Sequence, residues 1–135
     1  PLGVKGVEDL RKVRYVNRQK GSGTRILLDY LLKQNGIEPS KVKGYEREEI
    51  THTAVAAAVA SGTADAGMGI LSAARIYDLD FIPVVEEQYD LLVANNTFEN
   101  PQFKRLIEVL QSPEFAERLE GLGGYRLNRP GEVLA

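Results

Sequence analysis

Residues 14–32, RYVNRQKGSGTRILLDYLL, combine a short strand pattern with an amphipathic helix, joined through a serine framed by two glycines. The helix is predicted from four leucines at helical spacing: Leu27, Leu28, Leu31 and Leu32. Glycine turns the backbone without a Cβ penalty and lets an anion approach the main chain, and the first N–H groups of a helix have no acceptor within it. We therefore predict an oxyanion site at this helix start, formed by those N–H groups and by Arg18, Ser22, Gly23, Thr24 and Arg25.

A simpler interpretation of the same residues is a capped helix. Ser22 as N-cap would contribute about 1 kcal/mol. Arg25 favours the ligand interpretation, because a cation in the first turn opposes the helix dipole at a cost of roughly 0.3–1 kcal/mol. An ion pair with Asp29, four residues later, would return only about 0.2–0.5 kcal/mol. Arg25 and Ser22 are thus expected to contact ligand rather than core, and to be replaceable with little loss of stability. No P-loop spacing is present.

Composition excludes several classes of function. The chain has 135 residues, enough for one domain, and its 17 basic and 19 acidic residues leave no basic footprint for nucleic acid. Without cysteine and with one histidine, it has no His/Cys zinc site, no disulfide and no thiol catalysis, and neither a metal nor another cofactor is expected. No membrane-length apolar run occurs, and the N-terminal stretch lacks the core of a signal peptide, so a cytoplasmic location is predicted.

Helices alternating with short strands predict an α/β fold. The helical segments are a turn at 7–12, a helix from 22 to 34, HTAVAAAVASG at 52–62 capped by Thr51, LSAARIYDL at 71–79, a helix around 103–110, and another from Ser112 to Gly123. The strand candidates are residues 14–19, KGYERE at 43–48, ADAGMGIL at 64–71 and DFIPVVEEQYDLLVAN at 80–95, the last broken or at an edge because of Pro83. Ligand crevices in such folds lie at strand carboxyl ends beside helix starts. Three such ends are candidates: 22–25, 51–52 and 69–72.

Other polar residues have structural alternatives. His52 would donate to a bound anion or serve as a neighbour of the helix cap. Gly69, in a glycine-rich strand, marks a close approach of ligand or backbone. The carboxylates Glu46, Glu48, Glu49, Glu86, Glu87 and Asp90 fit solvated faces, and Asp65 fits a turn residue that bonds the local backbone. A Ser/His/Asp triad would need Ser22 within hydrogen-bond reach of His52, which the sequence does not show, so no enzyme activity is predicted.

Four blocks resemble a known family: residues 14–32, GYEREEITHTAVAAAVASGTADAGMGI, EEQYDLLV and SPEFAERLEGLGGY. They are similar to the second lobe of a type II periplasmic-binding-protein fold, of the kind attached to molybdopterin biosynthesis proteins and helix-turn-helix regulators. The resemblance implies a clamshell that binds a small oxyanion such as molybdate or tungstate between two lobes. It places Ser22, Gly23 and Thr24 at the anion-contacting turn, and Thr51, His52 and Tyr89 near the cleft. From the residues alone, Tyr89 is equally a core aromatic.

The resemblance further implies that residues 1–135 form a single three-layer α/β sandwich lobe with a crossover and C-terminal helices. The first lobe is expected to be missing or incomplete, which makes the chain a fragment whose partners are that lobe or a fused domain. An exposed apolar lobe surface would then promote homo-oligomers. The expected function is non-catalytic oxyanion binding or sensing, linked to molybdenum cofactor metabolism. Two alternatives remain: a regulatory or delivery domain of a molybdopterin biosynthesis enzyme, and an interaction module that has lost its ligand.

Overall fold

The computed structural model describes residues 3–134, and the chain divides into two compact units, Pro1–Val84 and Val85–Ala135. The elements of the first unit are η1 (Val7–Lys12), β1 (Tyr15–Arg18), α1 (Gly23–Gln34), η2 (Pro39–Lys41), β2 (Glu48–Glu49), α2 (His52–Ala60), β3 (Ala66–Gly67) and α3 (Leu71–Ile76). Those of the second unit are α4 (Asn95–Phe98), α5 (Pro101–Leu110) and α6 (Pro113–Leu122). The predicted α/β class is confirmed, whereas the assignment to one particular lobe stays a prediction.

The first unit is built on a three-stranded parallel sheet with the strand order β2-β1-β3. In the central strand, Arg18 pairs with Glu49, and Val16 pairs with Gly67. Parallel neighbours need a crossover connection, and α1 and α2 supply the two that are required here. Every ladder of this sheet therefore runs through β1.

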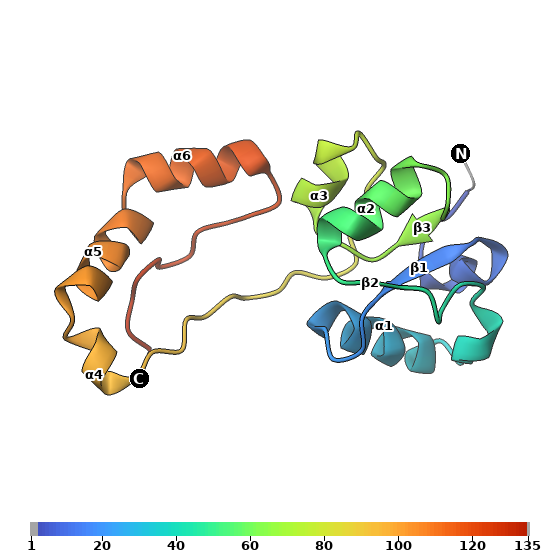
Figure 1. Cartoon of the computed structure of the whole chain (residues 1–135), viewed down its shortest axis with the longest axis horizontal. Helices are drawn as coiled ribbons and strands as arrows, with labels where there is room; N and C mark the ends of the chain where they lie inside the picture. The colour runs from blue at the N-terminus through green and yellow to red at the C-terminus, as the bar shows by residue number, and fades with distance from the viewer. Residues whose placement is uncertain (1–2, 135) are drawn as a thin grey trace. The chain divides into compact units, whose positions relative to one another are not determined.

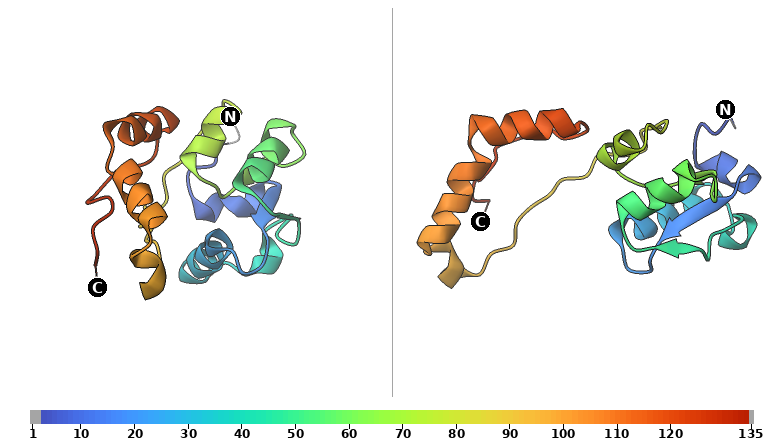
Figure 2. Two further views of the ribbon diagram at one scale, coloured as in Figure 1. Left: turned by 60° about the vertical axis from the view of Figure 1, so that its left-hand side comes forward. Right: turned by 45° about the horizontal axis from the view of Figure 1, so that its top comes forward.

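Helices cover both faces of the sheet, with α1 on one side and α2 and α3 on the other (Figures 1 and 2). Successive β1 side chains alternate between these faces. Tyr15 joins the core under α1, which also contains Leu28 and Leu32, and Val16 joins the core under α2 together with Val55. Because both faces are buried, β1 has almost no polar surface, and the first unit has three layers.

The helix ends follow the predicted signals. Ser22 and Thr51 are the N-caps of α1 and α2, with hydroxyl oxygens that accept from the N–H groups of Arg25 and Ala54. The α1 helix ends at Gln34, directly before Asn35 and Gly36, as predicted. In the second unit, Ser112 caps α6 through the Phe115 N–H group at 3.2 Å. Capping of this kind contributes about 1 kcal/mol per helix.

The strand predicted for residues 80–95 is wrong. This segment is extended but has no assigned strand, and α4 begins at its last residue, Asn95. In the described chain, none of its N–H groups before Thr97 donates to a backbone carbonyl. A strand is defined by a paired neighbour, which alternating apolar residues alone do not provide. Tyr89 and Leu92 are 74% and 100% exposed. Self-association through an exposed apolar lobe surface stays a prediction.

Two further strand predictions were too long. At the predicted segment 43–48, the strand is only Glu48–Glu49, which extends one residue beyond it. Within the predicted segment 64–71, the strand is only Ala66–Gly67. Within residues 3–134, no helix is both long and apolar enough to cross a lipid bilayer. In the same residues, no group of three potential metal-binding side chains comes together.

Candidate functional site

The carboxyl ends of the three parallel strands meet at one edge of the sheet. The strands β1, β2 and β3 end at Arg18, Glu49 and Gly67, and each leads into a helix of the first unit. Parallel strands place such ends side by side. The topology therefore brings together the segments predicted around Ser22, Thr51 and Gly69. Tyr89, the remaining residue predicted near the cleft, belongs to the second unit, so its place near a cleft stays a prediction.

The connection from β1 to α1, which we call the 19–24 turn, retains unused hydrogen-bond donors. Its backbone closes through the Ser22 N–H group, which donates to the Gln19 carbonyl at 3.2 Å, and Gly21 supplies the positive φ of 88°. The Ser22 hydroxyl oxygen accepts from the Arg25 N–H group at 3.1 Å, so Ser22 is an N-cap. Within residues 3–134, the N–H groups of Gly23 and Thr24 have no acceptor.

Arg18 brings a positive charge to the same edge. Its Nη2 atom donates to the Ile50 carbonyl at 2.9 Å, and its Nε atom donates to the Gln19 side chain at 3.2 Å. No carboxylate of the described residues forms an ion pair with Arg18. An arginine without a carboxylate partner retains the ability to bind an anion.

The start of α2 lies beside the loop that follows β3. The Thr51 hydroxyl oxygen accepts from the Ala54 N–H group at 3.0 Å and lies 3.1 Å from the Thr53 hydroxyl. A Cβ atom built at Gly69 would lie 3.8 Å from Nδ1 of His52, so the His52 ring and Gly69 are neighbours. Because Arg18 bonds the carbonyl of Ile50, directly before Thr51, the ends of β1 and β2 are tied together.

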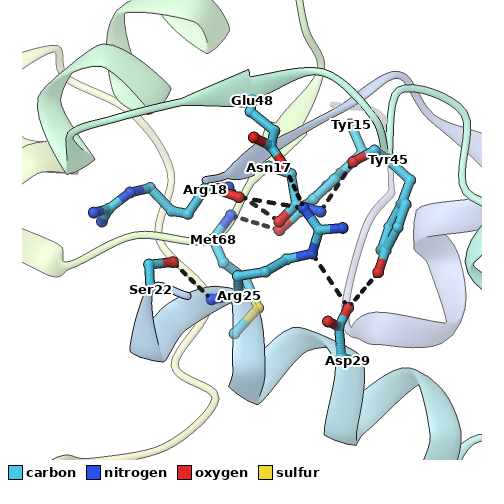
Figure 3. Close-up of polar contacts among 9 residues, drawn as sticks. All are labelled: Tyr15, Asn17, Arg18, Ser22, Arg25, Asp29, Tyr45, Glu48 and Met68. Carbon is cyan, nitrogen blue, oxygen red and sulfur yellow. Dashed lines mark hydrogen bonds and ion pairs between the residues drawn. The ribbon is translucent and has the colours of Figure 1, made fainter. Parts of the chain in front are cut away.

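Arg25 does not follow the prediction that it avoids the core. The residue is 3% exposed, and its side chain points away from the 19–24 turn into a polar cluster (Figure 3). Its Nη1 atom donates to Glu48 Oε1 at 3.1 Å and to the Arg18 carbonyl at 3.3 Å, and its Nε atom donates to Asp29 Oδ1 at 3.4 Å. The guanidinium carbon lies 4.1 Å from the Tyr45 ring centroid. The expectation that Arg25 contacts ligand rather than core is therefore wrong, and we now expect its replacement to cost stability.

Three groups of this cluster, Arg25, Tyr45 and Tyr15, have pKa values above their ordinary values. Burial by itself lowers the pKa of the Arg25 guanidinium, but the interactions with Tyr45 and Asp29 outweigh burial and leave the pKa raised. Burial and the hydrogen bond to Asp29 raise the pKa of Tyr45. Burial also raises the pKa of Tyr15, whose hydroxyl oxygen accepts from the Met68 N–H group at 3.1 Å. The raised pKa values keep Arg25 charged and both tyrosines neutral at neutral pH.

Sequence reasoning missed most members of this cluster. The sequence predicts only a weak helical pair for Asp29 and a solvated face for Glu48, whereas both carboxylates accept from Arg25. Buried Asn17, which donates to the Tyr45 carbonyl at 3.1 Å, was not considered. The available signal was an asparagine directly after Tyr15 and Val16 in a strand expected between helices, because buried amides need partners.

The family model that matches residues 1–111 is described as the PBP superfamily domain. The chain belongs to this family. The finding confirms the expected periplasmic-binding-protein-like domain, a class of domain that generally binds ligands, and it leaves attachment to molybdopterin proteins untested.

Two relatives share 39% identity with this PBP-like domain. One is the "Uncharacterized protein YvgK" of Bacillus subtilis (strain 168), aligned over 99% of the present chain and 44% of its own length. The other is the "Uncharacterized protein in ferredoxin 2Fe-2S gene 5'region" of Clostridium pasteurianum, aligned over 81% of the present chain and 97% of its own length. The chain thus spans less than half of the Bacillus protein. No solved structure matches the chain.

Proposed function

We propose that this PBP-like domain binds a small oxyanion, such as molybdate or tungstate, at the carboxyl edge of its sheet. In this proposal, the N–H groups of Gly23 and Thr24 donate to the anion, and Arg18 supplies the positive charge. The start of α2, with Thr51 and His52, forms the opposite side of the site. Binding occurs without catalysis and serves sensing or delivery linked to molybdenum cofactor metabolism in the cytoplasm.

The observation that carries the proposal is the unpaired charge of Arg18 beside a helix start with unused donors. Within residues 3–134, Arg18 has no carboxylate partner, and the first N–H groups of α1 have no acceptor. An oxyanion satisfies both, because it accepts several hydrogen bonds and neutralises the cation. The family supports binding of a small ligand, and the choice of molybdate or tungstate comes from the resemblance of the sequence blocks.

Calorimetric titration with molybdate, tungstate, sulfate and phosphate tests this function. The titration uses this chain and, in parallel, the longest natural protein that contains it. We expect one of the four anions to bind with clear preference. Failure of all four anions to bind either protein would overturn the proposal.

Replacing Gly23 with alanine tests the position of the anion. A Cβ atom at Gly23 has no protein atom within 4 Å and the residue has no positive φ, so Gly23→Ala leaves the fold intact. The added methyl group would occupy the space in front of the proposed donors and weaken binding. Gly121→Ala is the matched control, because Gly121 is also a helical glycine with open space around it, in the second unit. Equal affinities for these two variants would place the anion elsewhere.

A further inference from the structure

We propose that Arg25 is a positioning residue that sets the 19–24 turn and couples the starts of α1 and α2, without contacting the ligand. This inference rests on the proposed oxyanion site and names the group that holds it in shape. The Arg25 side chain is 4% exposed, which leaves little surface for a ligand from solvent. The guanidinium lies among Asp29, Glu48 and the Arg18 carbonyl, away from the Ser22 hydroxyl (Figure 3).

Arg25 holds the 19–24 turn from both sides. Its main-chain N–H group donates to the Ser22 hydroxyl oxygen at 3.1 Å. Its Nη1 atom donates to the Arg18 carbonyl, on the other side of the turn, at 3.3 Å. A displaced guanidinium would release the end of β1 relative to the start of α1. Gly23 and Thr24, the proposed donors, lie between Ser22 and Arg25 in the chain.

The same guanidinium connects the turn to the neighbouring strand. Nη1 also donates to Glu48 Oε1 at 3.1 Å, and Glu48 is the first residue of β2. Two residues later, the Ile50 carbonyl accepts from Arg18 at 2.9 Å, and Thr51 and His52 follow. Arg25 therefore fixes the α1 start, the end of β1 and the strand that leads to α2. The distance between the two helix starts depends on it.

Only arginine can make this set of contacts. The Nε atom donates to Asp29 at 3.4 Å while Nη1 serves its two acceptors, and the guanidinium lies over the Tyr45 ring. The Tyr45 hydroxyl donates to Asp29 Oδ1 at 2.6 Å and holds that carboxylate in place. Lysine has a compact ammonium on a flexible stem and lacks the planar fork. Arg25→Lys therefore keeps the charge and removes the geometry.

The competing explanation is that Arg25 only stabilises the fold. Arg14→Lys is the matched control, because Arg14 forms a two-point ion pair with Asp65 at the amino edge of the same sheet. That variant also replaces the fork of an arginine and keeps its charge. Glu48→Ala is a milder second variant, should Arg25→Lys fold poorly, since it removes one acceptor of the Arg25 guanidinium.

The test compares anion affinity by calorimetry with the thermal midpoint for the same variants, using the anion that binds the wild-type chain best. We expect Arg25→Lys to lower affinity about tenfold, as loss of an outer partner of a binding group does, and Glu48→Ala to lower it less. Arg14→Lys should lower the thermal midpoint and leave affinity unchanged. Wild-type affinity in a folded Arg25→Lys variant would overturn the inference.

A second readout separates this inference from the proposed function. If the wild-type chain binds none of the four anions, that function fails, and the amide resonances of Gly23, Thr24 and His52 then decide the positioning role. Shifts of all three in Arg25→Lys, with none in Arg14→Lys, would support coupling of the helix starts. Unchanged resonances would show a purely structural arginine.

Discussion

The arginines at the two edges of the small sheet have different partners. At the amino edge, Asp65 accepts from the Arg14 main-chain N–H group at 2.8 Å, from Nε at 3.0 Å and from Nη2 at 2.5 Å. At the carboxyl edge, Arg18 bonds a carbonyl and an amide oxygen but has no carboxylate partner in the described chain. The fold neutralises a cation at one edge and leaves the other available where helix starts gather. This contrast is why we propose the anion site at the carboxyl edge.

Loss of Arg25 should have the largest effect on stability. Arg25→Ala removes a buried cation and leaves two carboxylates beside the space it occupied. Breaking a buried pair costs about 3–5 kcal/mol, and we expect about 3 kcal/mol here because Asp29 and Glu48 are 45% and 33% exposed. Chemical denaturation measures the change in the free energy of unfolding. Arg18→Ala is the comparison, and a loss of stability as large as that of Arg25→Ala would contradict the assignment of roles.

Arg18 should matter most for binding. Arg18→Ala removes the cation proposed to face the oxyanion, and a charge-assisted hydrogen bond contributes about 1.5–3 kcal/mol. Affinity for the preferred anion should therefore fall by at least about tenfold in calorimetry. Arg14→Ala, at the opposite edge, should bind as the wild-type chain does. If the two variants bind equally, the two edges do not differ in function.

The amino edge should respond to acid. The hydrogen bond from Arg14 holds the pKa of Asp65 below its ordinary value. A carboxylate with a lowered folded-state pKa stabilises the fold above its unfolded pKa of about 3.9, and this contribution disappears as the pH falls through the folded-state value. Asp65→Asn should therefore be less stable than wild type at neutral pH, and the difference should shrink in acid. Denaturation over a pH series on Asp65→Asn, Arg14→Ala and the double variant checks this, and additive single losses would argue against a coupled pair.

Ser22 should give the smallest effect, and it separates capping from binding. Ser22→Ala should cost about 1 kcal/mol of stability, whereas Ser22→Gly should cost only a few tenths, because glycine is tolerated at an N-cap. A hydroxyl that also serves the ligand would make both variants bind more weakly. Thermal melts and titrations on the two variants distinguish the roles. Normal affinity in Ser22→Gly would leave Ser22 as a cap alone.

The sequence predicted the parts of the fold that depend on local chemistry. Ser22 and Thr51 fixed the starts of two helices, because hydroxyl caps and apolar spacing are properties of neighbouring residues. The gathering of their segments at one edge followed from the alternation of helices and strands. The prediction of a strand at residues 80–95 was wrong, because a strand needs a paired neighbour that its own residues do not specify.

The buried cluster could not be predicted, because its contacts depend on tertiary structure. Arg25 and Glu48 are 23 residues apart, and Tyr45 reaches Asp29 across 16 residues. The helix dipole argument correctly indicated that Arg25 needs compensation, but it could not tell a ligand from carboxylates of the protein itself. The same reason applies to Asp65, which was expected to bond the local backbone. It instead accepts from Arg14, 51 residues away in the sequence.

The central position of β1 has a consequence for synthesis. This strand leaves the ribosome first, yet each of its ladders joins it to a strand that emerges later, and the ion pair beside it spans 51 residues. In the described sheet, β2 and β3 each pair with β1 and not with one another, so these two strands alone do not form a sheet. Among the three described strands, β1 therefore gains its first partner when β2 emerges, and the sheet is complete only once β3 follows. The first unit is therefore expected to fold in one cooperative step.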